Sequence, residues 1–168
     1  MARNVSDHLV ARLSAWGVRR VYGYPGDGIN GLMGAMNRMR EKMQFVQTRH
    51  VELAAFMATA HAKFGGDIGV CMATSGPGAI HLLNGLYDAK ADHQPVLAIV
   101  GQQQPAALGG DYQQEVDLAS LLQGLRARVR ADDRRARAGA ARERSRNPHR
   151  PRSTHRDVRD RAERRAGA

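Results

Sequence analysis

Residues 68–101 read IGVCMATSGPGAIHLLNGLYDAKADHQPVLAIVG and hold two continuous apolar runs separated by a helix-forming segment. The first run, at 68–73, and the second, at 95–101, are typical of strands that are buried on both faces of a parallel sheet. A tight loop at 75–78 follows the first run, and a predicted helix over 79–91 follows the loop. This strand–loop–helix–strand order predicts a βαβ unit and therefore a parallel sheet.

The preceding residues repeat the same alternation of helix and strand. Apolar residues at helical spacing and short β-branched or aromatic runs mark the elements. In chain order, the predicted elements are a helix at 5–16, a strand at 19–24, a turn at 25–31, a helix at 29–39, a strand at 44–48 and a helix at 50–64. The fold class predicted for this part is α/β, with a parallel sheet flanked by helices on both faces.

Ligands of parallel sheets bind beyond the carboxyl ends of the strands. Two loops rich in Gly and Pro, residues 23–26 and 75–78, fall at those ends, and residues 102–104 lie just past the last predicted strand. Such turns are also routine in folds of this class. Neither loop carries the G-x-G-x-x-G or G-K-[ST] phosphate motifs, so we expect this domain not to hold a diphosphate.

The remaining reactive residue types suggest no further site. Cys71 is the only cysteine and lies in an apolar strand, so we expect a core role and no disulfide. The histidines lack zinc-like grouping, so no metal site is predicted, and His61 and His93 are expected to have structural or surface roles. The amino terminus is amphipathic and no run approaches the ~18 apolar residues of a membrane span, which predicts a cytoplasmic protein without a membrane segment.

Charge divides the chain into two parts. The formal net charge is +10, yet residues 1–124 hold ten Lys or Arg and ten Asp or Glu. Residues 125–168 hold sixteen Arg and six acidic residues, with no Lys, Phe, Trp or Tyr. We expect such a tail to be disordered, because it cannot bury enough apolar surface to offset its ordering entropy. Arginine could attract phosphates without sequence preference, but the lack of aromatic residues argues against a specific nucleic-acid partner.

Three stretches taken together are more specific than either loop: GYPGDGINGL at 23–32, the long segment at 48–102 from TRHVELAAF to VLAIVGQ, and DYQQEVDL at 111–118. They resemble the amino-terminal, pyrimidine-binding domain of thiamine-diphosphate enzymes of the pyruvate oxidase, quinone-linked pyruvate dehydrogenase and acetolactate synthase group. The resemblance implies a flavodoxin-like domain over residues 1–122, incomplete at its end, and leaves residues 123–168 as a tail.

The resemblance also implies a function. In the family, this domain binds the aminopyrimidine half of thiamine diphosphate, while a carboxy-terminal domain of a partner subunit holds the diphosphate through a metal ion, usually Mg²⁺. Many members carry FAD in a middle domain, and neither the Mg²⁺ site nor the FAD site is expected in this sequence. The implied substrate is pyruvate or another 2-oxo acid, decarboxylated with the cofactor as electron sink. The implied partner is a second copy or a full-length family subunit, contacted through the domain interface.

Matching the family's motifs assigns a set of cofactor-binding positions in the two loops, the following helix and the DYQQEVDL segment. These positions are Pro25, Gly26, Val51, Thr74, Pro77, Gly78, His81 and Gln114.

The activating position departs from the family. A glutamate usually follows arginine and histidine there, whereas this sequence reads Arg49-His50-Val51-Glu52. Valine can neither donate nor accept the hydrogen bond that the family's glutamate makes to the pyrimidine ring. Glu52 is a weak substitute, because one helical residue turns it about 100° away. Glyoxylate carboligase, in the same superfamily, resembles this chain at RHVE and works with valine, which offers carboligation as an alternative; we favour a drifted or damaged copy.

The resemblance stops near Leu122, before the last strand and helix of the family's domain. The residues that follow look like out-of-frame translation of GC-rich DNA. We therefore expect a frameshifted, truncated product that is inactive alone and has an unpaired sheet edge. Two alternatives are a non-catalytic partner that docks onto an intact thiamine enzyme and a non-specific nucleic-acid binder that acts through the basic tail.

Overall fold

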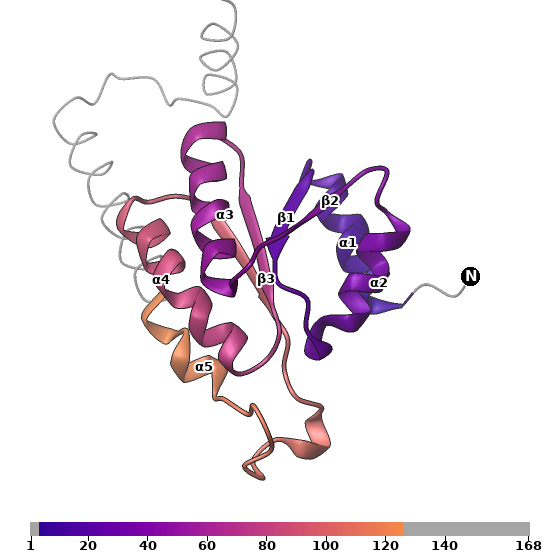
Figure 1. Ribbon diagram of the computed structural model, residues 1–168, viewed down its shortest axis with the longest axis vertical. Helices are drawn as coiled ribbons and strands as arrows, with labels where there is room; N and C mark the ends of the chain where they lie inside the picture. The colour runs from indigo at the N-terminus through magenta and orange to yellow at the C-terminus, as the bar shows by residue number, and fades with distance from the viewer. Residues whose placement is uncertain (1–3, 126–168) are drawn as a thin grey trace, which may run out of the picture. The chain divides into compact units, whose positions relative to one another are not determined.

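Four parallel strands pair in the order β2-β1-β3-β4 in the computed structural model, which describes residues 4–125 (Figure 1). The strands are β1 (Arg20–Gly23), β2 (Gln44–Gln47), β3 (Gly69–Ala73) and β4 (Val96–Val100). The chain goes outward from β1 to β2 and then returns across β1 to β3. This order is that of flavodoxin-like doubly wound sheets, in which ligands bind where the direction of winding reverses, here between β1 and β3.

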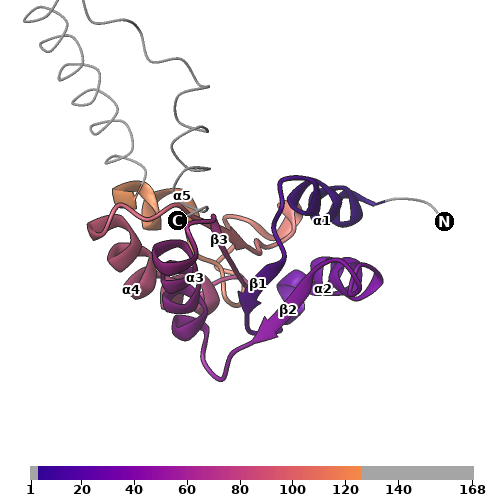
Figure 2. The ribbon, with the colours of Figure 1, turned by 90° about the horizontal axis from the view of Figure 1, so that it is seen from above.

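Helices cover both faces of the sheet, as the views in Figures 1 and 2 agree. The helices α1 (Val5–Ala15) and α2 (Asn30–Arg38) pack on one face, and α3 (Val51–Gly65) and α4 (Pro77–Ala91) pack on the other. Two short 3₁₀ turns, η1 (Asp27–Ile29) and η2 (Pro105–Ala107), and a short helix α5 (Leu118–Leu121) complete the described elements. The predicted α/β class is confirmed.

Strand β3 is the centre of the core, because all five of its residues are buried. Val70 and Met72 point into the apolar cluster beneath α1 and α2, whereas Cys71 and Ala73 point into the cluster beneath α3 and α4. The predicted burial on both faces is confirmed here, as is the core role of Cys71. Loss of hydration in that core raises the pKa of the Cys71 thiol to about 12.

The same prediction is wrong for β4, whose five residues are all only partly buried. In the described part of the chain, β4 is an edge strand that pairs with β3 alone. Leu97 and Ile99 still pack against the α1–α2 cluster, and Val96, Ala98 and Val100 pack against the α3–α4 cluster. The residues of β4 are apolar because both faces of the strand pack against a core cluster. The strand is only partly buried because its outer edge has no neighbouring strand in the described residues.

Helix α4 begins earlier than the sequence predicts, at Pro77 rather than Ala79. Proline is well suited to the first position of a helix, because its fixed φ is helical and its missing N–H would have no partner there. The loop after β3 is therefore short: Thr74, Ser75 and Gly76 connect the strand to the helix.

Residues 123–125 pack on the domain, although the sequence places them in the tail. The Nζ atom of Lys90 donates a hydrogen bond of 2.6 Å to the carbonyl oxygen of Gly124, and Leu125 lies against the α3–α4 cluster. The rest of the predicted tail, residues 126–168, lies outside the described residues. Within residues 4–125, no helix is both long and apolar enough to cross a membrane.

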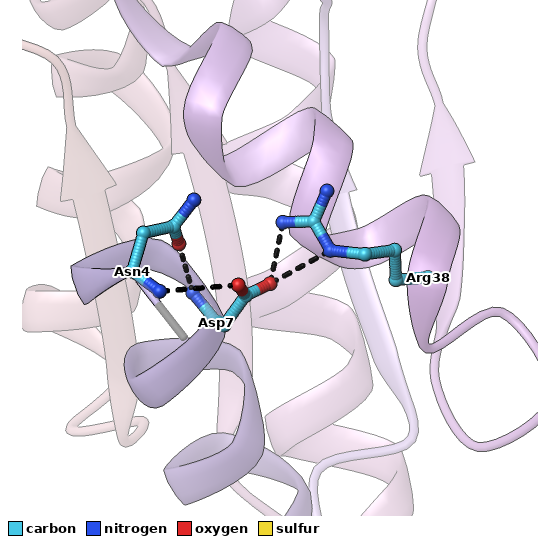
Figure 3. A network of polar contacts seen from close by, with 3 residues as sticks. All are labelled: Asn4, Asp7 and Arg38. Atoms are coloured by element: carbon cyan, nitrogen blue, oxygen red, sulfur yellow. Dashed lines mark hydrogen bonds and ion pairs between the residues drawn. The ribbon is translucent and has the colours of Figure 1, made fainter. Parts of the chain in front are cut away.

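A polar network joins the start of α1 to the end of α2 (Figure 3). The Asn4 side-chain oxygen accepts a hydrogen bond of 2.8 Å from the backbone N–H of Asp7, and the Asp7 carboxylate accepts one of 3.3 Å from the backbone N–H of Asn4. The Arg38 guanidinium pairs with the same carboxylate, with its Nε atom at 2.9 Å. Asp7 therefore serves a capping box and an interhelical ion pair at once.

Replacing the cap should loosen α1. Asn4→Ala removes the acceptor for the Asp7 N–H, so we expect the free energy of unfolding to fall by about 1 kcal/mol. Trp16 is the only tryptophan and caps the carboxyl end of α1, which makes its fluorescence a suitable probe in urea titrations. Asn4→Ser keeps a capping oxygen and should stay close to the unaltered protein; equal losses for both variants would contradict the capping argument.

Candidate functional site

The loops after β1 and β3 meet at the side chain of Thr74. The Thr74 hydroxyl accepts a hydrogen bond of 3.1 Å from the backbone N–H of Gly28 and lies 3.3 Å from the Asp27 carboxylate, to which it donates. The same carboxylate accepts a 2.8 Å hydrogen bond from the Gly28 N–H. Gly26 also lies against Thr74, because a Cβ atom placed on Gly26 would be 2.6 Å from the Thr74 Cβ. The first loop is thus tied to the second.

The end of β4 joins these loops at Gly101. This residue is buried, and its N–H donates a 3.0 Å hydrogen bond to the carbonyl oxygen of Ala73. A Cβ atom at this position would be 2.7 Å from the backbone carbonyl oxygen of Gly28 and 3.2 Å from the backbone nitrogen of Ser75. Three strand ends therefore meet backbone to backbone, and only glycine fits between them.

Gln114 reaches the same place from the segment after β4. Its backbone is left-handed, with φ of 62°, and Gly76 opposite it has φ of 60°. A Cβ atom on Gly76 would collide with the Gln114 carbonyl oxygen and lie 2.8 Å from its Cβ. Gln103 links the two sides: its Nε2 atom donates to the Ser75 hydroxyl at 3.3 Å and to the Gln113 carbonyl at 2.9 Å.

The segment that carries Gln114 is folded around the carboxylate of Glu115. That carboxylate accepts hydrogen bonds from the backbone N–H groups of Gly109 and Tyr112, the latter at 3.0 Å. These bonds favour the charged form, and the N–H of Gly109 contributes most to lowering the pKa of Glu115. The Glu115 backbone N–H in turn donates to the Tyr112 carbonyl at 2.8 Å.

The start of α3 forms the other side of the region. Val51 is the first residue of the helix, is only 8% exposed and packs with Tyr22 in the α3–α4 cluster. The Glu52 carboxylate accepts a hydrogen bond from the side-chain amide of Asn84 on α4, and it lies 3.8 Å from the Nδ1 atom of His50. Val51 therefore packs in the core, whereas the Glu52 carboxylate is bonded to the side chain of Asn84 on α4.

His81 lies beside the start of α3. The ring centroids of His50 and His81 are 4.6 Å apart, which connects the second turn of α4 to the residue that caps α3. His61, by contrast, is tied to the core, because its Nδ1 atom is 3.0 Å from the Tyr22 hydroxyl. Tyr22 and His61 therefore link β1 to α3, and the expected structural role of His61 is confirmed.

The structure thus gathers the residues singled out from the sequence into two groups. Gly26, Thr74, Gly78 and Gln114 belong to the loop group, and a Cβ atom placed on Gly78 would be 3.0 Å from the Thr74 Cγ2. His81 joins His50 beside Val51 at the start of α3. Pro25 is half-buried in the first loop and Pro77 is exposed at the start of α4.

Three polar residues of the loop group were missed as individual site residues: Asp27, Ser75 and Gln103. Asp27 and Ser75 stand within or beside the two Gly/Pro loops, and Gln103 lies in the 102–104 stretch past the last strand. The sequence therefore predicted that these residues lie near the loops, but it did not predict which of them contact one another. Across residues 4–125, no group of three or more His, Cys, Asp or Glu is placed to hold a metal ion.

Comparison with known proteins identifies the family to which this domain belongs. The family profile described as thiamine pyrophosphate enzyme, N-terminal TPP binding domain, matches residues 3–121. YdaP of Bacillus subtilis is 53% identical over 113 residues, which cover 67% of this chain and 20% of YdaP. Pyruvate oxidase of Lactiplantibacillus plantarum is 48% identical over 105 residues, covering 62% of this chain and 17% of the oxidase.

An acetolactate synthase subunit is similar over the same region. The large subunit of acetolactate synthase isozyme 2 of Escherichia coli is 42% identical over 118 residues, which cover 70% of this chain and 21% of that subunit. The chain therefore spans about one fifth of the length of these curated relatives.

The close approach at Gly101 can be tested directly. Gly101→Ala places a Cβ against the Gly28 carbonyl, so the loops must separate, and we expect a loss of roughly 1–3 kcal/mol in the free energy of unfolding. Gly110→Ala is the matched control, because its Cβ would be 3.6 Å from the nearest neighbouring atom, an ordinary contact. Urea titrations that follow Trp16 fluorescence would measure both; similar stability of the two variants would contradict the packing of the three loops.

Proposed function

Since this chain belongs to the thiamine pyrophosphate enzymes and matches their N-terminal TPP-binding domain, we propose that residues 4–125 bind the aminopyrimidine half of the cofactor. The observation that carries the proposal is the convergence of the loops after β1, β3 and β4 where the winding of the sheet reverses. That is where doubly wound sheets bind ligands.

The residues at this edge suit a neutral heterocycle better than a diphosphate. The groups that meet there are backbone amides, the hydroxyls of Thr74 and Ser75, the amide of Gln103 and the carboxylate of Asp27. Hydroxyl, amide and peptide groups can bind ring nitrogens and an exocyclic amine, whereas a carboxylate repels a polyanion. We propose that another domain or another subunit holds the diphosphate, with its metal ion.

The start of α3 does not fit the activating role. Val51 is buried in the cluster that contains Tyr22, and its side chain carries only methyl groups, which cannot form a hydrogen bond. The Glu52 carboxylate is already bonded to Asn84. We therefore assign no proton transfer to this position: the domain binds the ring and does not activate it.

For the whole protein to which such a domain belongs, we propose decarboxylation of a 2-oxo acid such as pyruvate, with FAD in a further domain or with carbon–carbon bond formation. The names of the relatives support this reaction class, since they include a pyruvate oxidase and acetolactate synthases. In these enzymes the bound cofactor supplies an electron sink for decarboxylation. Val51 favours one alternative, carboligation of the glyoxylate carboligase kind, which proceeds with valine at this position.

Thiamine, which lacks the diphosphate, tests the proposal on the full chain. Saturation-transfer NMR should show stronger contact at the pyrimidine C6 proton than at the thiazolium protons, and 4-methyl-5-(2-hydroxyethyl)thiazole, the isolated thiazole fragment, should not compete. The thiazolium C2 proton should exchange with solvent deuterium at the rate seen without protein. Val51→Glu restores a carboxylate that can bond the ring and should accelerate that exchange, while Val51→Gln should not.

Absence of thiamine contact at millimolar ligand would refute binding of the ring by this domain. Accelerated exchange with the unaltered chain would instead refute the assignment of Val51 as a position that does not activate.

We also propose a partner surface on the outer side of α3 and α4. Leu53, Phe56 and Met57 of α3 are 47%, 38% and 38% exposed, and Ile80 and Tyr87 of α4 are 44% and 46% exposed. The two helices lie side by side over one face of the sheet (Figure 1). Large side chains that recur along two adjacent helices are suited to packing against a second pair of helices, and we propose a second copy of this chain as the occupant.

A charge on this surface should prevent the association. Phe56→Lys should convert a concentration-dependent dimer into a monomer, because the buried ammonium would have no partner. Trp16→Lys is the matched control: Trp16 is 63% exposed but follows α1, on the opposite face of the sheet. Sedimentation equilibrium distinguishes the variants, and a monomer at every concentration of the unaltered chain would refute the surface.

A further inference from the structure

We propose that Gln103 is a positioning residue that holds Gln114 at the cofactor end of the sheet. The inference rests on the proposed function in one respect: Gln114 matters to ligand binding only if the loops bind the pyrimidine ring. The juxtaposition itself is independent of any ligand, because it consists of contacts among residues of this chain.

The side-chain amide of Gln103 bridges two segments that are otherwise far apart in sequence. Its Nε2 atom donates one hydrogen bond to the Ser75 hydroxyl, at 3.3 Å, and another to the carbonyl oxygen of Gln113, at 2.9 Å. An amide nitrogen has two N–H donors, so both bonds can form at once. Ser75 is buried, which fixes one end of the bridge on the rigid end of β3.

The other end of the bridge determines where Gln114 lies. Gln113 is its direct neighbour, and Gln114 has a left-handed backbone that brings its Cβ and carbonyl oxygen against Gly76. A non-glycine residue adopts this conformation only when its surroundings impose it. The hydrogen bond from Gln103 to the Gln113 carbonyl restrains the backbone directly before Gln114, the residue with the unfavourable conformation.

The segment around Gln114 is internally braced and would move as a unit. The Glu115 carboxylate accepts hydrogen bonds from the N–H groups of Gly109 and Tyr112, so residues 109–115 are joined by contacts of their own in addition to those with Gly76 and Gln103. Gln103 acts at a different point, where this segment meets the loop after β3. Removing the bridge should therefore displace Gln114 without unfolding the segment or the domain.

Gln103→Glu tests the bridge, because a carboxylate has nearly the same size and cannot donate to the Gln113 carbonyl. Gln104→Glu is the matched control: it adds the same charge one residue later, at an exposed position. Gln103→Lys restores an N–H donor on a side chain of similar reach. All variants are made in the full 168-residue chain.

The first measurement needs no ligand. One α-proton of Gly76 takes the place that a Cβ atom would have in another residue, and it therefore lies close to the Gln114 Cβ. The unaltered chain should show a nuclear Overhauser contact between this proton and the Gln114 β-protons. We expect this contact to be lost in Gln103→Glu and kept in Gln104→Glu and Gln103→Lys. Persistence of the contact in Gln103→Glu would overturn the proposal.

The second measurement is thiamine affinity, followed by chemical-shift titration. Loss of the bridge should weaken binding by about 2- to 10-fold, the equivalent of one hydrogen bond, with Gln104→Glu unchanged and Gln103→Lys restored. Unchanged affinity after loss of the Gly76–Gln114 contact would overturn the role of Gln103 in the site. If the unaltered chain binds no thiamine, the proposed function fails, and the bridge is then decided by the nuclear Overhauser contact alone.

Discussion

The approach of Gly101 to the carbonyl oxygen of Gly28 is the constraint on which the functional end of the domain depends. Parallel strands end at the same edge, so their loops must share a small space, and backbones can approach this closely only where side chains are absent. A glycine-rich loop in such a fold is often interpreted as a phosphate cradle. Here the glycines have another cause: a Cβ at Gly101 or Gly76 would collide with protein backbone, before any ligand is considered.

Val51, which the family resemblance places beside the cofactor ring, is a core residue of the α3–α4 cluster. Burial of a valine side chain at the start of α3 contributes to the α3–α4 cluster, whereas a glutamate there would lose hydration unless a ligand supplied a hydrogen bond. A carboxylate at this position would therefore lower the free energy of unfolding of the domain when no ligand is bound. Valine makes no such demand on a ligand, because its methyl groups pack in the α3–α4 cluster without a hydrogen-bond partner.

The sequence predicted the features that depend on local pattern. The apolar run of β3 and the helical spacing of α1 and α3 report burial directly, so their class and approximate bounds were predictable. The exposure of β4 was not, because burial of an edge strand depends on which strand lies next to it. The contacts of Gln103 were also out of reach, since they join residues separated by 10 and 28 positions through side-chain amides. Gln114 was found only through a motif, and its left-handed backbone has no local signal.

The distribution of charge argues for a division of the cofactor between polypeptide segments. The one carboxylate among the loop contacts, Asp27, already accepts hydrogen bonds from Gly28 and Thr74, and in the described residues the arginine and lysine ion pairs lie elsewhere, at Asp7, Glu41 and Asp92. A diphosphate placed beside Asp27 would be repelled by the negative charge of its carboxylate. A neutral ring placed here could hydrogen-bond to the hydroxyls and amides of the loop group. These contacts support the proposal that this edge of the sheet binds the neutral half of the cofactor and that the phosphates are held elsewhere.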